Sequence, residues 1–168
     1  DSLNIAISYN LKNKMDSSDL NGTDDINIDI EQTVVMISIA DKLLFNTASF
    51  KVKSGAYPFL ERLANLLKLE PSMDVMIEGH TDSQSINNAD VQDNWELSAK
   101  RATAIVRILE GKHKVDGSRL IAAGRGSTVP LMPNTSNENR AKNRRTKIII
   151  LPNLDKFFAL IAEDKIKN

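Results

Sequence analysis

Strand-length apolar segments alternate with helix-length amphipathic segments along most of this chain, and that order strongly limits its possible folds. Apolar runs at 73–78 and 120–123 predict buried strands, and 146–151 is a third strand. Helical periodicity occupies 58–69 and the segment from 94 or 95 to 110. Residues that alternate in polarity at 26–30 and the run at 34–40 predict a β-hairpin. The order strand, helix, strand, helix, strand is typical of right-handed crossovers between parallel neighbours. We therefore expect an α/β (α+β) fold: a βαβαβ-type mixed parallel and antiparallel sheet with helices packed against it.

The length of 168 residues fits one domain with an appendage. We assign an N-terminal extension to 1–24, with a short amphipathic helix or strand over 2–15 followed by a polar loop. The domain proper then covers 25–168, with the hairpin first, a core motif at 34–151 and a closing helix at 153–165. The chain begins at Asp1 instead of Met, so we expect a processed or truncated product.

Composition excludes several classes of function. Lys and Arg (22) balance Asp and Glu (22), which argues against nucleic acid as a partner. The basic run Arg140–Lys147 lacks interleaved aromatic residues, so we interpret it as a solvated face. No cysteine is present, and His80 and His113 are too few for a histidine metal cluster, so we expect no metal and no cofactor. No serine lies in a nucleophile elbow, and we expect no enzyme.

One charged residue lies on the wrong side of the helix predicted after residue 93. The apolar face of that helix is formed by Leu97, Ala104, Ile105, Ile108 and Leu109. Arg101 falls inside this face, and an arginine held inward needs an anionic partner or ligand. Asp82, which follows the strand 73–78, is the candidate we expect nearby; the pair is either a buried ion pair or a reader of zwitterions. Asp93 and Glu96 have the spacing of a capping box at the start of this helix.

Several ordered motifs carry a family resemblance. They are Leu44-Phe45-Asn46, Ile77-Glu78-Gly79-His80-Thr81-Asp82, Asn94-x-x-Leu97-Ser98-x-x-Arg101-Ala102, Gly124-x-Gly126, Pro130, Asn134 and Asn139-Arg140-Ala141-x-Asn143-Arg144-Arg145. Together they resemble the OmpA-like C-terminal domain, the peptidoglycan-binding module shared by OmpA, Pal and MotB. The resemblance spans roughly 34–151.

The resemblance implies noncovalent binding of peptidoglycan through the meso-diaminopimelate of the stem peptide. It implies that Asp82 takes the ammonium group of that residue and that Arg101 helps to hold its charged end. Four further residues match positions that line or support the family pocket: Thr81, Asn94, Leu97 and Arg144. Arg145 is expected to tie down the fold. The module would anchor a periplasmic, outer-membrane-associated protein of a Gram-negative envelope to the cell wall. The membrane segment of that protein is expected to lie outside this chain. Whether the domain forms a homodimer is left open.

Departures from the family pattern leave alternatives. The loop between Asp82 and Asn94 is longer than in OmpA, and Asn94–Ser98 is closer to MotB, which makes a MotB-like stator anchor of a motor one alternative. A cell-wall hydrolase is the enzymatic alternative. Ala48 stands where some relatives have an asparagine that touches ligand, and Ser49 is a candidate substitute.

Overall fold

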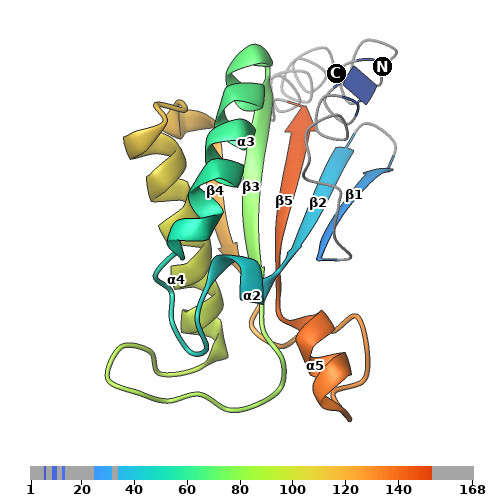
Figure 1. The fold of residues 1–168 in the computed structure, drawn as a ribbon, viewed down its shortest axis with the longest axis vertical. Coiled ribbons are helices and arrows are strands. Elements are labelled where there is room, and N and C mark those ends of the chain that lie inside the picture. The colour runs from blue at the N-terminus through green and yellow to red at the C-terminus, as the bar shows by residue number, and fades with distance from the viewer. Residues whose placement is uncertain (1–5, 7–8, 11–12, 14–24, 32–33, 153–168) are drawn as a thin grey trace, which may run out of the picture.

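A computed structural model describes residues 6, 9, 10, 13, 25–31 and 34–152. It contains a five-stranded sheet in the order β1-β2-β5-β3-β4 (Figure 1). The strands are β1 (Ile26–Glu31), β2 (Val34–Ala40), β3 (Met73–His80), β4 (Leu120–Gly124) and β5 (Arg145–Pro152). β3 and β4 pair in parallel, whereas β1 with β2, β2 with β5, and β5 with β3 pair antiparallel. The predicted mixed sheet is therefore confirmed.

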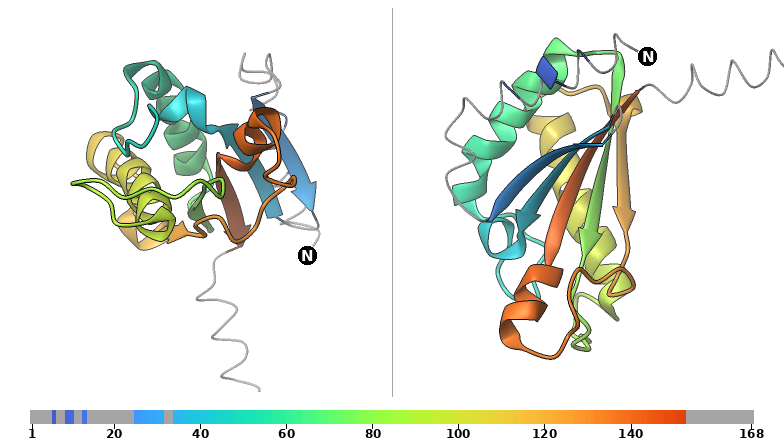
Figure 2. Two further views of the ribbon diagram at one scale, coloured as in Figure 1. Left: turned by 90° about the horizontal axis from the view of Figure 1, so that it is seen from below. Right: turned by 90° about the vertical axis from the view of Figure 1, so that its right-hand side faces the viewer.

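The longer helices cover one face of this sheet. They are α3 (Tyr57–Leu69) and α4 (Asn94–Arg107), the second continued by a π-helical turn over Ile108–Lys112 (Figure 2). Beneath them, Ile37, Ile148 and Ile77 lie in register on adjacent strands and are fully buried. These residues meet Leu60 and Leu63 of α3 in one aliphatic core. Burial of this kind is the main source of stability in a domain that is poor in aromatic residues.

Short helices lie at one edge of the sheet. α2 (Asp41–Leu44) follows β2 directly, and α5 (Asn137–Asn143) leads into β5. The carboxyl ends of β2, β3 and β4 and the amino end of β5 meet at this edge, at the bottom of Figure 1. Side chains that follow those strands are therefore brought together, although they are far apart in the sequence.

The structure also corrects parts of the sequence-based expectation. β2 and β3 are not neighbours, because β5 lies between them and is antiparallel to both. The strand predicted at 120–123 is present as β4, but β4 is an edge strand whose Ile121 and Ala122 are exposed, so its expected burial was wrong. α5 was not predicted. The closing helix at 153–165 lies outside the described residues; so does most of 2–15, whose described positions 6, 9, 10 and 13 are helical. The division of the chain at residue 24 stays a prediction.

Candidate ligand-binding site

The first turn of α4 fixes the position of the inward-facing arginine. The Asp93 carboxylate accepts a hydrogen bond from the backbone N–H of Glu96 at 2.8 Å, as the predicted cap requires. The Glu96 carboxylate in turn accepts from the backbone N–H of Gln92 at 2.9 Å, one residue before the cap. Two turns later, Arg101 lies inside the apolar face and is 4% exposed. The predicted anomaly on this helix is therefore present in the structure.

Arg101 is held by three partners that lie before α3 in the sequence. Its Nη1 donates to the Asp41 carboxylate in an ion pair. Its Nε donates to the backbone oxygen of Ser49 at 2.8 Å, and its Nη2 to that of Asn46 at 3.2 Å. The guanidinium also lies 4.8 Å from the centroid of the Phe45 ring. Arg101 thus fixes the turn at 46–49 against α4.

A second ion pair lies at the mouth of the site. The Asp82 carboxylate accepts from Nη1 of Arg144 at 2.6 Å and from the backbone N–H of Gln84 at 2.9 Å. Asp82 is 5% exposed, whereas the Arg144 side chain is 37% exposed. The carboxylate is therefore held in place by the protein, and part of its guanidinium partner faces solvent. This pair presents an anion and a cation side by side.

The two ion pairs form one charged cluster of Asp41, Asp82, Arg101 and Arg144. Burial raises the pKa of Asp41 and lowers the pKa of Arg101, because both charges have been taken out of water. Each of these groups also interacts electrostatically with Asp82 and Arg144. A charge that binds at Asp82 or Arg144 consequently also interacts electrostatically with the buried pair of Asp41 and Arg101.

The expected direct pair of Asp82 and Arg101 is not formed. Arg101 takes Asp41 as its partner, and Asp82 takes Arg144. The reason is topological: Asp41 follows β2 and Arg144 precedes β5, so each of the predicted residues Asp82 and Arg101 meets a different partner at this edge of the sheet. Sequence reasoning missed Asp41. The position of this acidic residue directly after a predicted strand could have indicated that it lies at the same edge of the sheet as Asp82.

The remaining predicted residues surround the Asp82 loop. Thr81 donates its backbone N–H to the oxygen of Gly126 at 2.9 Å and its hydroxyl to the backbone oxygen of Asp82 at 2.9 Å. Asn94 donates its side-chain amide to the backbone oxygens of Asp82 and Gln84 at 3.3 and 2.9 Å. These contacts order the loop that carries the carboxylate. Leu97 is a buried residue of α4.

Two other predicted positions have structural roles. Arg145 is buried and donates to the backbone oxygens of Asn143 and Val129 at 3.0 and 3.1 Å, which agrees with a role in the fold. His80 is buried, and its Nε2 lies 2.6 Å from the Glu78 carboxylate, so it is a hydrogen-bonded histidine at a strand end. Among the described residues, no group of three or more His, Cys, Asp or Glu side chains is placed to hold a metal ion. No helix of the described part is long and apolar enough to span a membrane.

Fold and site together define a class of protein: a mixed α/β domain that displays paired acidic and basic side chains at the edge where its strands end. The model of the OmpA family matches residues 44–144, which is more than half of the chain. The chain therefore belongs to the OmpA family.

Individual relatives point in the same direction. Motility protein B of Bacillus subtilis is 34% identical over 118 residues, which cover 70% of this chain and 45% of that protein. The crystal structure of a MotB-like protein from Desulfovibrio vulgaris has a TM-score of 0.82 at 28% identity, covering 90% of this chain and 92% of that one. The cell wall anchor of the T6SS from Pseudomonas aeruginosa has a TM-score of 0.76 at 29% identity, covering 84% and 96%. The chain spans about half the length of the curated relatives it matches first.

Proposed function

We propose that this domain binds peptidoglycan noncovalently, through the meso-diaminopimelate of the stem peptide, and so anchors a larger protein to the cell wall. The observation that carries the proposal is the Asp82–Arg144 pair, a buried carboxylate beside an arginine whose side chain is partly exposed. The distal end of diaminopimelate carries an ammonium and a carboxylate on one carbon. A zwitterion of that shape matches both members of the pair with charges of the opposite sign.

Each residue of the proposed site has a distinct task. Asp82 accepts the ligand's ammonium, and Arg144 turns its free nitrogens to the ligand's carboxylate. Arg101 supports that charged end from behind and holds the turn at 46–49 in place. Thr81 and Asn94 keep the Asp82 loop ordered, and Leu97 is buried on the helix α4 that carries Asn94 and Arg101. Binding in this way needs no covalent step, so we propose a binding module and not a hydrolase.

The comparisons support the wall as the target. One similar structure is described as a cell wall anchor, and the family model covers the segment that contains Asp82, Arg101 and Arg144. We place the domain in the periplasm of a Gram-negative envelope. Its tether is proposed to lie outside this chain, in the outer membrane or, for a motor protein, elsewhere.

Pull-down with purified sacculi tests the proposal. Asp82→Asn keeps the shape and the acceptor for Gln84 but removes the charge, and we expect retention on sacculi to fall about tenfold or more. Asp90→Asn makes the same chemical change at an exposed position in the same loop and should bind as the wild type does. Arg144→Gln should also lose binding, while Arg107→Gln, on the exposed side of α4, should not. Equal retention of Asp82→Asn and wild type, with both folded by circular dichroism, would reject the site.

A MotB-like stator anchor is the second candidate. The similarity to Motility protein B of B. subtilis favours it specifically. It requires a membrane-spanning helix with an acidic residue upstream of this domain in the full-length protein. A deletion strain that swims normally would exclude this role and leave wall anchoring in place.

A further inference from the structure

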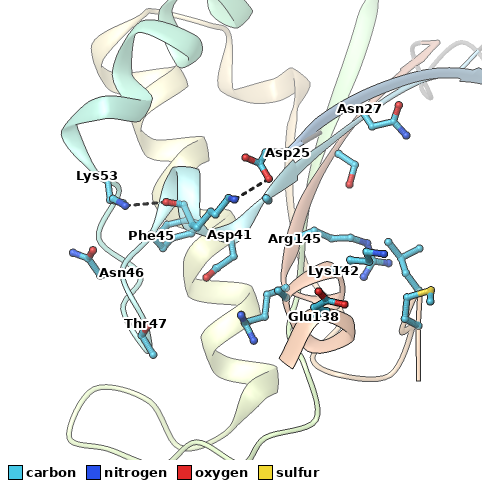
Figure 3. Close-up of a pocket in the computed structure, with 17 residues that line it drawn as sticks. Asp25, Asn27, Asp41, Phe45, Asn46, Thr47, Lys53, Glu138, Lys142 and Arg145 are labelled. Carbon is cyan, nitrogen blue, oxygen red and sulfur yellow. Dashed lines mark hydrogen bonds and ion pairs between the residues drawn. The ribbon is translucent and has the colours of Figure 1, made fainter. Parts of the chain in front are cut away.

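A large cavity lies beside the charged cluster, between the β1–β2 hairpin, α2 and α5 (Figure 3). Its volume is about 850 Å³, within the range of sites that enclose a small ligand. We call it the hairpin cavity. Its lining includes Asp25 and Asn27 from the hairpin, Asp41 and Lys42 from α2, and Lys142 from α5. Those from 25–42 precede the segment that the family model matches, so this wall lies outside the matched segment.

The hairpin cavity is continuous with the proposed peptidoglycan site. Asp41 and Arg144 line it, and these residues are also the partners of Arg101 and Asp82. A ligand whose zwitterion rests on Asp82 and Arg144 therefore has the cavity directly beside it. A peptide bound at that point has to continue away from the cluster, and the cavity offers it a path that is partly open to solvent.

One wall of the cavity presents apolar side chains on a backbone that is held by hydrogen bonds. Leu131 is 59% exposed and Met132 is 37% exposed. Their backbone N–H groups both donate to the side-chain oxygen of the fully buried Asn143, at 2.8 and 2.9 Å, and the Asn143 amide returns a bond to the Met132 oxygen at 2.8 Å. The loop is ordered before any ligand arrives, which reduces the entropic cost of binding there.

The charge of the lining is positive, because five cations face three carboxylates. The cations are Lys42, Lys53, Lys142, Arg144 and Arg145, and the carboxylates are Asp25, Asp41 and Glu138. Lys42 is paired with Asp25 at 3.1 Å, and Lys53 donates to the backbone oxygen of Lys42 at 2.8 Å. Lys142 has no hydrogen-bond or ion-pair partner in the described part of the chain. Of the three lysines in the lining, Lys142 is therefore the one available to an incoming anion.

We propose that the hairpin cavity is a second subsite, which takes the free carboxyl-terminal end of the stem peptide. The residue after diaminopimelate is an alanine, whose methyl group suits Leu131 and Met132 and whose terminal carboxylate suits Lys142. A cross-link converts that carboxylate into an amide and removes its charge. The domain would then prefer stem peptides that are not cross-linked through this end. This subsite rests on the proposed function, since the zwitterion at Asp82 positions the peptide.

Titration with two soluble peptides tests the subsite: the tetrapeptide stem ending in D-alanine, and the same peptide with a carboxyl-terminal amide. Isothermal titration calorimetry measures the affinity for both peptides. We expect wild type to bind the acid about five- to tenfold more tightly than the amide. Lys142→Met should abolish this preference while keeping affinity for the amide. Lys68→Met, at an exposed position of α3 remote from the cavity, should keep it.

The outcomes separate this inference from the function on which it rests. Asp82→Asn should weaken both peptides equally, because it acts on the shared zwitterion. If Asp82→Asn loses both peptides but Lys142→Met retains the full preference for the acid, the subsite is wrong and the proposed function survives. If wild type binds neither peptide, both are rejected. Leu131→Asn tests the contact with the alanine methyl group separately. This variant should bind the alanine-ended peptide about as weakly as a glycine-ended one.

Discussion

The turn that Arg101 holds contains a residue in a left-handed conformation. Ala48 has φ of 57°, within a turn closed by the N–H of Ser49 and the oxygen of Asn46 at 3.1 Å. A side chain with a Cβ pays about 1 kcal/mol or more in that region, and asparagine is among the residues that tolerate it best. The asparagine that some relatives have at this position therefore suits the backbone as well as a ligand. The suggested substitute, Ser49, uses its hydroxyl oxygen to accept from the N–H of Lys51 at 3.1 Å.

Ala48→Gly should accordingly stabilise the protein, by about 0.5–1 kcal/mol, because glycine adopts positive φ without the steric cost. Urea unfolding followed by circular dichroism measures the change. Ala99→Gly is the matched control, an identical substitution at an exposed position inside α4, where it should destabilise by about 1 kcal/mol. Destabilisation by both variants would contradict the argument from backbone conformation.

At the scale of elements, the packing of α4 on the sheet depends on two glycines. A Cβ on Gly79 would collide with the backbone oxygen of Ser98, and one on Gly124 would lie 2.7 Å from the backbone nitrogen of Ala99. Backbone atoms of α4 are the obstacles, so no side-chain rotation can relieve the overlap. The same helix carries Asn94 and Arg101. This close approach therefore also sets how far those two residues lie from the sheet.

Gly79→Ala should therefore push α4 outward, with a loss of about 1–3 kcal/mol in the free energy of unfolding and weaker retention on sacculi. Gly55→Ala is the control, because nothing lies within 4 Å of the Cβ it would add. Thermal unfolding and the sacculus assay, run on both variants, measure the two effects. A Gly79→Ala protein as stable as Gly55→Ala would show that the helix does not need this approach.

The elements that the sequence predicted correctly are those with strong periodicity. The hairpin, α3 and α4 have apolar residues at regular spacing, and α4 has a recognisable cap. α5 escaped prediction because its seven residues, Asn137–Asn143, form no apolar stripe and follow two prolines. The exposed β4 was mistaken for a buried strand because a run of four or five apolar residues does not reveal whether a second strand will cover its edge. The Arg101–Asp41 pair spans 60 positions, which no local pattern can report.

At the scale of the whole molecule, a buried histidine makes stability depend on pH. His80 lies against Glu78, and burial, followed by the positive charge of Arg145, holds its pKa below the ordinary value, although the hydrogen bond to Glu78 acts in the opposite direction. Its Nδ1 is buried without a hydrogen-bond partner in the described structure, so protonation there gains no acceptor. The folded protein therefore keeps His80 neutral in a range of pH where the unfolded chain binds a proton.

The sign of the pH effect follows from this difference in proton binding. Above a pH of about 6.5, both states hold a neutral imidazole and the full stability is present. As the pH falls below that value, the unfolded state takes up a proton first, and stability decreases by at most about 1.4 kcal/mol per pH unit until the folded pKa is reached. Urea unfolding at pH 7.5 and 5.5 should show this loss in the wild type and a smaller one in His80→Gln. His113→Gln removes the other of the two histidines and is the matched control. If His80→Gln loses as much stability between these pH values as the wild type, His80 does not set the dependence.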